Sequence, residues 1–205
     1  MQYKNIIFDL GVVLLDVDYN LAAAAFRKLG IPDFDAHYSK AQQDRFFDRF
    51  ETGHMTDEEF RIKLRQYLPS HVTNHQIDEA WNAMLLKVPE ENFQLLEKLN
   101  KSKRIFLLSN TNRIHIRAFS KIIDLQYGFE KFERLFEKAY YSCNIGLRKP
   151  DAEIFDLVVK ENQLDLSETI FIDDSPQHIE GARNYGLNVV LLKQGDNLSK
   201  IVGEL

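Results

Sequence analysis

Six side chains that lie at or near the ends of apolar runs could together carry out phosphoryl transfer. They are Asp9, Ser109, Asn110, Lys149, Asp173 and Asp174. A carboxylate can attack phosphorus to form an aspartyl phosphate, provided that a cation offsets the repulsion between the two anions. Asp9 ends the short run IIF, so we expect it at the end of a strand as the nucleophile. A plain turn aspartate is the alternative for Asp9 alone.

Asp173 and Asp174 are adjacent carboxylates directly after the apolar run TIFI. Their mutual repulsion is most easily relieved by a hard cation such as Mg2+, which prefers oxygen ligands. One carboxylate would bind the metal directly, and the other could hold its water molecules. The alternative is a solvated turn before a helix, where acidic side chains are favoured in any case.

Ser109, Asn110 and Lys149 supply groups that could bind an anion. Ser109 and Asn110 close the run RIFLLSN and precede a helical segment, whose first backbone N–H groups lack partners and attract phosphate. Lys149, directly before Pro150, adds a cation at the start of another helical segment. A serine helix cap and a solvated surface lysine are the ordinary alternatives. The order of nucleophile, anion donors, lysine and paired acids favours a single site.

The elements that position these groups alternate between strand and helix. Four β-rich apolar runs predict buried strands at residues 4–8, 104–109, 169–173 and 188–192. Helices are predicted over 89–100, after Thr111, after Pro150, and from a Ser175 N-cap to Gly186. This alternation indicates an α/β fold with a parallel sheet that helices cover on both faces.

Residues 16–88 interrupt the alternation, because they contain helical segments and no convincing strand. Helices are predicted over 20–28, around 36–50, after a capping box at Thr56–Glu59, and over 75–87. So many helical residues between two core strands are better explained as an inserted cap than as a loop. We therefore predict a core of residues 1–15 and 89–205 and a helical cap of residues 16–88.

The composition of the chain indicates which class of partner and which cellular compartment to expect. The net charge of −5 argues against a nucleic-acid partner, which usually selects a basic surface, and makes a small molecule the better expectation. No apolar run approaches the roughly 20 residues of a membrane-spanning helix. Cys143 is the only cysteine, which excludes an intrachain disulfide framework and fits a reducing cytoplasm. The oligomeric state stays open.

These motifs resemble those of the haloacid dehalogenase-like (HAD) superfamily, which consists mostly of Mg2+-dependent phosphatases. The matching segments are FDLG with Asp9, LLSN with Ser109, RKP with Lys149, and IDDS with Asp173 and Asp174. The resemblance covers the whole chain and implies a Rossmann-like core with a C1-type cap. The segments DLG, SNTNR and GLRKPDAEIF further resemble the sugar-phosphate branch that includes bacterial α-D-glucose-1-phosphate phosphatase.

The resemblance also assigns roles to residues of the site. It implies that Asp9 attacks phosphorus, with Lys149 as a second catalytic residue, and that Mg2+ is bound by Asp9, Asp174 and the backbone carbonyl of Gly11. Ser109, Asn110 and Lys149 would hold the phosphoryl oxygens, and Asp173 would support the metal site without binding the ion. The implied function is a Mg2+-dependent phosphomonoesterase for a small metabolite, such as the sugar phosphate glucose 1-phosphate.

Gly11 departs from the superfamily pattern, which places a second aspartate two residues after the nucleophile as general acid. A positioned acid typically contributes about 10²- to 10⁴-fold in rate. Either the leaving group departs without help, or another residue replaces the acid, with Asp16, Asp18 and His115 as the candidates. A non-catalytic phosphosugar-binding module is the third explanation. A haloacid dehalogenase is also conceivable, but it would leave the acidic pair partly unexplained.

Overall fold

The computed structural model describes residues 3–31 and 45–204, and its central element is a five-stranded parallel sheet. The strands are β1 (Asn5–Phe8), β2 (Arg104–Ser109), β3 (Lys138–Tyr141), β4 (Thr169–Asp173) and β5 (Asn188–Leu191). They lie in the order β3-β2-β1-β4-β5, and all four pairings are parallel. The four predicted strands and the α/β class are confirmed. The sequence analysis missed β3, a four-residue edge strand with the sequence KAYY.

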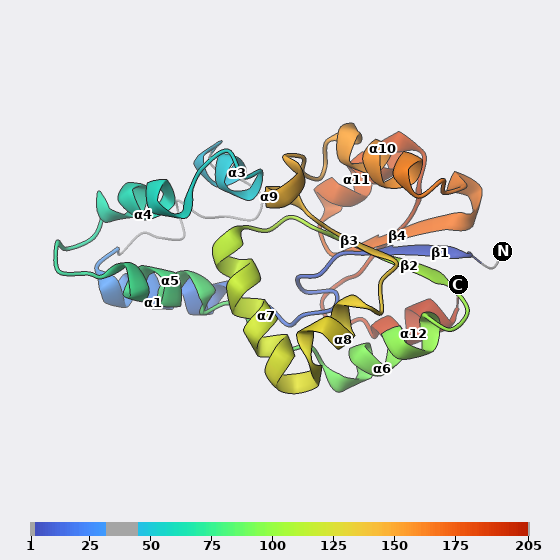
Figure 1. Ribbon diagram of the computed structural model, residues 1–205, viewed down its shortest axis with the longest axis horizontal. Coiled ribbons are helices and arrows are strands. Elements are labelled where there is room, and N and C mark those ends of the chain that lie inside the picture. The colour runs from blue at the N-terminus through green and yellow to red at the C-terminus, as the bar shows by residue number, and fades with distance from the viewer. Residues whose placement is uncertain (1–2, 32–44, 205) are drawn as a thin grey trace.

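Helices cover both faces of this sheet (Figure 1). One face carries α6 (Glu90–Leu99), α7 (Arg113–Tyr127), α8 (Phe129–Glu133) and α12 (Leu198–Gly203). The other carries α10 (Ala152–Glu161) and α11 (Pro176–Tyr185). Two short elements complete the core, α9 (Ser142–Ile145) and a 3-10 helix (Leu166–Glu168). None of the helices in the described ranges is both long and apolar enough to cross a bilayer.

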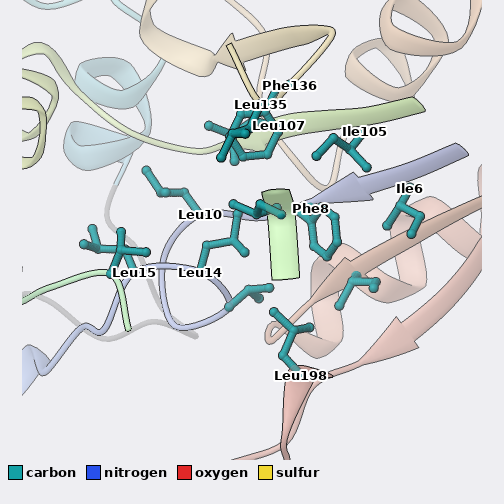
Figure 2. Packing of buried hydrophobic residues seen from close by; sticks show 14 of the residues in the cluster. Ile6, Phe8, Leu10, Leu14, Leu15, Ile105, Leu107, Leu135, Phe136 and Leu198 are labelled. Atoms are coloured by element: carbon teal, nitrogen blue, oxygen red, sulfur yellow. The ribbon is translucent and has the colours of Figure 1, made fainter. Parts of the chain in front are cut away.

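Alternate residues of the central strand β1 explain why both faces are covered. Ile6 and Phe8 pack into the cluster beneath α6, α7 and α12, which Figure 2 shows from close by, whereas Ile7 packs against α10 and α11. All three side chains are fully buried. Burying one such side chain stabilises the fold by about 1.5–3 kcal/mol. A strand that is apolar on both faces thus fits the centre of a two-sided sheet.

The helix boundaries that position the site follow from local residue chemistry. The helix α11 begins with Ser175 as N-cap and Pro176 at the first helical position, as predicted. It ends at Gly186, whose φ of 110° lies in the left-handed region that glycine adopts without a Cβ clash. The predicted helix over 89–100 is confirmed as α6.

The inserted segment is helical and lies beside the sheet rather than on it (Figure 1). Its described helices are α1 (Tyr19–Leu29), α3 (Arg45–Glu51), α4 (Asp57–Arg65) and α5 (Asn74–Asn82). The predicted capping box is present, because Thr56 and Glu59 cap each other at the start of α4. Of the helix predicted around 36–50, residues 36–44 lie outside the described residues and the remainder belongs to α3.

The helical segment has its own aromatic core. Trp81 and Phe60 are buried there, with ring centroids 5.0 Å apart, and Phe50 stacks on Phe60 at 4.1 Å. All the other buried members of this cluster lie between residues 22 and 84, apart from Ile114 of α7. We therefore propose residues 16–88 as a cap on the core formed by residues 1–15 and 89–205.

The two chain segments that connect the cap to the core run side by side. The Asp16 N–H donates to the Lys87 carbonyl at 2.8 Å, and the Leu86 N–H donates to the Asp16 carbonyl at 3.0 Å. Val17 pairs with Leu85 in an antiparallel bridge. This pairing takes up residues 85–87, which were predicted as the end of a helix, so α5 stops at Asn82.

Candidate active site

The carboxyl ends of the strands open into a cavity of about 300 Å3. Asp9 follows β1, Ser109 ends β2, and Asp174 follows β4, and all three line this cavity together with Gly11. Parallel strands end at the same edge of a sheet, which brings these residues together across more than 160 positions of sequence. The structure thus brings the predicted site residues into one place.

Lys149 lies at the centre of this arrangement and is fully buried. Its ammonium Nζ is 2.6 Å from Asp9 Oδ1, 2.7 Å from Asp173 Oδ2 and 2.8 Å from the Leu108 carbonyl oxygen. These acceptors use all three donors of the ammonium group. Lys149 is therefore a fixed positive charge between two carboxylates, and not the solvated surface lysine that was the alternative.

In this cluster, the Lys149 ammonium and the carboxylates of Asp9 and Asp173 each favour the charged form of the other. Burial disfavours the charged form of Lys149, but the Asp173 and Asp9 carboxylates outweigh it and raise the lysine pKa. Burial also acts to raise the pKa of Asp173, but Lys149 and His178 hold that pKa below its ordinary value. Burial raises the pKa of Asp9 above its ordinary value, and the Lys149 ammonium offsets only part of that rise. A buried cation beside Asp9 favours the carboxylate that a nucleophile requires.

The oxygen atoms near Lys149 fit a hard divalent cation. Asp9, Asp173 and Asp174 each offer a carboxylate oxygen, and these oxygens lie within 4.8 Å of one another. The Asp173 carboxylate already accepts from Lys149, from the Ser175 N–H at 2.7 Å, and from His178 Nδ1 at 3.0 Å. The Asp173 carboxylate therefore holds the neighbouring Lys149, Ser175 and His178 in place. Asp9 and Asp174, the carboxylates that the family resemblance implies as Mg2+ ligands, are suited to hold the ion, and this assignment stays a prediction.

Asn110 lines the cavity, but its side chain holds the segment that carries Lys149. The Asn110 Nδ2 donates to the Lys149 carbonyl at 2.9 Å, and the Lys149 N–H donates to Asn110 Oδ1 at 3.0 Å. Both ends of the amide are thus committed to one neighbouring backbone. The phosphate-binding role of Asn110 stays a prediction.

Gly11 lines the cavity two residues after Asp9, with room for a side chain. A Cβ at this position would have Val17 Cγ2 as its nearest neighbour at 3.6 Å, an ordinary van der Waals contact. Backbone strain does not require glycine there, because the φ of Gly11 lies outside the left-handed region. The absence of an acidic side chain at Gly11 is therefore a chemical feature and not a steric necessity.

The predicted replacements for that acid have other roles or positions. Asp18 is the N-cap of α1, where its carboxylate accepts from the Asn20 N–H. Neither Asp16 nor Asp18 is among the described residues that line the cavity. His115 does line it, but burial lowers its pKa to about 4, and its Nε2 lies 3.2 Å from the Trp81 carbonyl oxygen. A neutral imidazole whose N–H is directed at a carbonyl is a poor proton donor.

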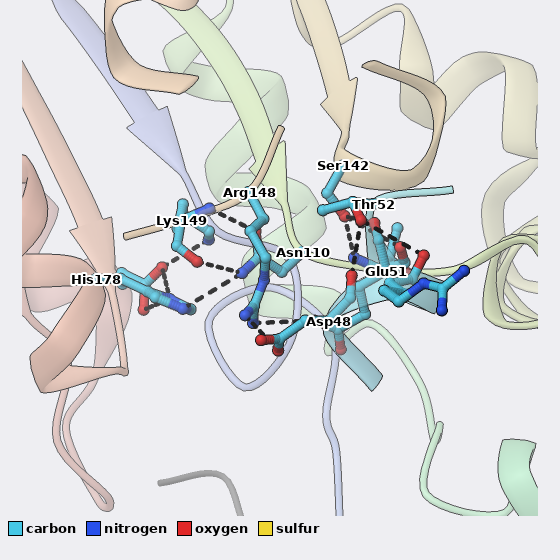
Figure 3. A network of polar contacts seen from close by, with 11 residues as sticks. Asp48, Glu51, Thr52, Asn110, Ser142, Arg148, Lys149 and His178 are labelled. Atoms are coloured by element: carbon cyan, nitrogen blue, oxygen red, sulfur yellow. Dashed lines mark hydrogen bonds and ion pairs between the residues drawn. The ribbon is translucent and has the colours of Figure 1, made fainter. Parts of the chain in front are cut away.

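Four residues of the cavity with acidic, guanidinium or imidazole side chains were missed by the sequence analysis. They are Asp48, Glu51, Arg148 and His178. Figure 3 shows the Arg148 side chain extending from the segment beside Lys149 to Asp48 and Glu51 on α3. One signal was available, because Asp48 and Glu51 are three residues apart and share a face of a helix. Nothing local indicated that this face would turn toward the phosphate end of the sheet.

Known proteins resemble this chain along its length. A family model described as haloacid dehalogenase-like hydrolase matches residues 3–186. A D-ribitol-5-phosphate phosphatase from Bacteroides thetaiotaomicron is 31% identical over 192 residues, covering 94% of this chain and 93% of that protein.

Two solved structures have the same fold over nearly the whole chain. A HAD family enzyme from Bacteroides thetaiotaomicron, an aspartate-to-alanine variant in complex with magnesium and inorganic phosphate, has a TM-score of 0.90 at 34% identity. The alignment covers 97% of this chain and 98% of that one. A predicted HAD-like family hydrolase from Porphyromonas gingivalis has a TM-score of 0.87 at 27% identity, with 100% and 98% covered.

Proposed function

Because this chain belongs to the haloacid dehalogenase-like hydrolase family, we propose that it is a Mg2+-dependent phosphomonoesterase that acts on a small phosphorylated metabolite. The buried Lys149 ammonium between Asp9 and Asp173, next to Ser109 and Asp174, is the observation that carries the proposal. Two relatives support it: one is named a phosphatase, and the other was solved with magnesium and phosphate.

In the proposed reaction Asp9 attacks phosphorus and is the residue that becomes phosphorylated. Lys149 favours the charged form of the Asp9 carboxylate and adds positive potential where negative charge gathers on the phosphoryl oxygens. The Ser109 hydroxyl, at the end of β2, donates to one of those oxygens. Mg2+, held by Asp9, Asp174 and the Gly11 carbonyl, would neutralise charge on the transferring group. Asp173 keeps Lys149 in place.

The substrate that we propose is a sugar or polyol phosphate. A cavity of about 300 Å3 is at the small end of ligand sites, which suits a metabolite of five or six carbon atoms. Tyr19, Thr111 and Gln177 line the same cavity and offer donors and acceptors for hydroxyl groups. Ribitol 5-phosphate, named in the Bacteroides relative, is the first substrate to test, and glucose 1-phosphate from the motif resemblance is the second.

The proposal also includes the class of binding partner and the cellular location. The acidic net charge of −5 fits a small-molecule partner better than a nucleic acid. A cytoplasmic location rests on the single cysteine, Cys143, which is buried and free.

Phosphate release from a panel of sugar and polyol phosphates, with and without Mg2+, tests the proposal. We expect Mg2+-dependent release that Asp9→Asn abolishes and Asp156→Asn retains, because Asp156 pairs with Lys160 on the surface of α10. No Mg2+-dependent release from any ester would refute it. Calorimetric binding of a phosphosugar without turnover would instead support a binding module, the alternative that Gly11 suggests.

A further inference from the structure

The cap contributes to the cavity a buried carboxyl group that has no role in the proposed reaction steps. Glu51 ends α3, lines the cavity and is only 7% exposed. Its Oε2 lies 3.1 Å from Arg148 Nη2. Asp48, one helical turn earlier, lies 2.6 Å from Arg148 Nη1 but is more exposed. Arg148 thus joins two cap carboxylates to the core segment that also carries Lys149 (Figure 3).

The geometry of phosphoryl transfer fixes the side on which a proton is needed. The attacking and leaving oxygens lie roughly in line on opposite sides of phosphorus. Asp9 attacks from the strand ends, so the leaving oxygen departs toward the opposite wall of the cavity. Two cap residues, Asp48 and Glu51, line the same cavity as Asp9. The core position that would otherwise carry a proton donor is Gly11, which has none.

We infer that Glu51 is the general acid of the reaction and replaces, from the cap, the carboxyl group that is missing at Gly11. This inference rests on the proposed phosphatase function. A general acid has to be within reach of the leaving oxygen, and its contact with substrate commonly tightens only when the substrate is bound. Because α3 belongs to the cap, the contacts of Arg148 that dock α3 on the core also hold the acid at the cavity.

The surroundings of Glu51 suit a proton donor at neutral pH. Among the described residues, the charged and titratable groups that act on it or are acted on by it are Arg148, Asp48, Lys149 and Cys143. Burial raises the pKa of Glu51 to about 7, and the attraction of Arg148 only partly offsets that rise. At this pKa a carboxyl group can donate and recover a proton near pH 7.

The proton balance closes over the two half-reactions. Asp9 forms a bond to phosphorus, the bond from phosphorus to the leaving oxygen breaks, and that oxygen takes its proton from the Glu51 carboxyl group. The resulting Glu51 carboxylate lies beside the Arg148 guanidinium. Water then attacks the aspartyl phosphate and gives its proton to Glu51, while the bond from phosphorus to Asp9 breaks. Inorganic phosphate leaves and both carboxyl groups return to their starting states.

A comparison of two esters with Glu51→Gln tests this role. Ribitol 5-phosphate has a poor alkoxide leaving group that needs a proton, whereas p-nitrophenyl phosphate has a leaving group that departs without one. We expect kcat/KM of Glu51→Gln to fall by about 10²- to 10⁴-fold on the alkyl ester and by less than roughly tenfold on the aryl ester. An equal loss on both esters, or no loss, would overturn the inference.

Two further variants separate proton donation from cap docking. Asp48→Asn removes the other carboxylate on Arg148 from the same helix, and we expect it to change both esters by a similar factor. Gly11→Asp placed in the Glu51→Gln background meets only an ordinary contact at its Cβ and should restore alkyl ester hydrolysis. If the double variant recovers nothing while Gly11→Asp alone is active, Glu51 does more than donate a proton and the inference fails.

The wild-type protein supplies a test that does not depend on the folding of any variant. Hydrolysis of the alkyl ester should decline as the pH rises above about 7, because the acid loses its proton, while hydrolysis of the aryl ester should not. Identical pH profiles for the two esters would overturn the role of Glu51 and leave the phosphatase function standing. No Mg2+-dependent hydrolysis of either ester would instead refute the phosphatase function.

Discussion

The ionisation of Glu51 can be measured without any enzyme assay, through the stability of the fold. Burial raises the pKa of Glu51 from its ordinary 4.5 to about 7. Below about pH 4.5 the carboxyl group is protonated in the folded and the unfolded chain. Between these values the unfolded chain releases the proton and the folded chain keeps it, so a rise in pH favours unfolding. Above about pH 7 the carboxyl group is ionised in both states, and its contribution to the free energy of unfolding no longer changes with pH.

The size of the effect follows from the two pKa values. The gap between 4.5 and about 7 corresponds to about 3 kcal/mol of stability lost at high pH, of which about 2 to 3 kcal/mol is lost between pH 5 and pH 8. Glu51→Gln removes the titrating proton and keeps the shape of the side chain. Its stability relative to wild type should therefore rise by about 2 to 3 kcal/mol between pH 5 and pH 8.

Urea denaturation of both proteins at several pH values, in Mg2+-free buffer, measures this difference. Glu59→Gln is a control of opposite sign, because hydrogen bonds from Thr56 lower the pKa of the exposed Glu59 carboxyl group. That carboxylate stabilises the fold above its ordinary pKa, so Glu59→Gln should lose stability relative to wild type as the pH rises through about 4.5. A stability difference for Glu51→Gln that is the same at pH 5 and pH 8 would refute the burial argument.

Three further outcomes follow from the same structure. Lys149→Met leaves the carboxylates of Asp9 and Asp173 facing each other without their cation. We expect undetectable turnover and, by urea denaturation, about 3–5 kcal/mol lower stability. An active Lys149→Met would contradict the role of the lysine. Mg2+ at about 100 times its Kd should raise the stability of wild type by about 2.7 kcal/mol, and a thermal shift that persists in Asp174→Asn would contradict the metal site. Phe60→Ala empties the centre of the cap core and should cost about 3–5 kcal/mol by urea denaturation, whereas a cost below about 1 kcal/mol would show that the cap does not depend on this cluster.

Several features of this protein could be predicted because their causes lie close together in the chain. The strands β2 and β4 begin and end where their apolar runs do. Thr56 caps α4 through hydrogen bonds with Glu59, Pro176 suits the first turn of α11, and Gly186 ends that helix in the left-handed region. The strand β3 was missed because four residues at a sheet edge carry too little pattern, and only pairing with β2 makes them a strand.

Some residues of the candidate site could likewise be predicted from the sequence, and others could not. Asp9, Ser109 and the pair Asp173-Asp174 could be predicted, because a parallel sheet gathers the carboxyl ends of its strands whatever the details of packing. The placement of Lys149 between two carboxylates depends instead on how Asn110 holds its backbone. The burial of that lysine therefore came only from the tertiary structure.

The proton donor is the clearest case of what the sequence by itself determined and what it left to the fold. The sequence shows that Gly11 carries no acid. It offered Asp16 and Asp18, which follow Gly11 closely, and His115, which follows the motif of Ser109. Glu51 lies 97 residues from Arg148, and their contact exists because the face of α3 that bears Glu51 turns toward the core. Burial at that contact raises the pKa of Glu51, and burial is decided by packing between distant segments, which local sequence patterns do not encode.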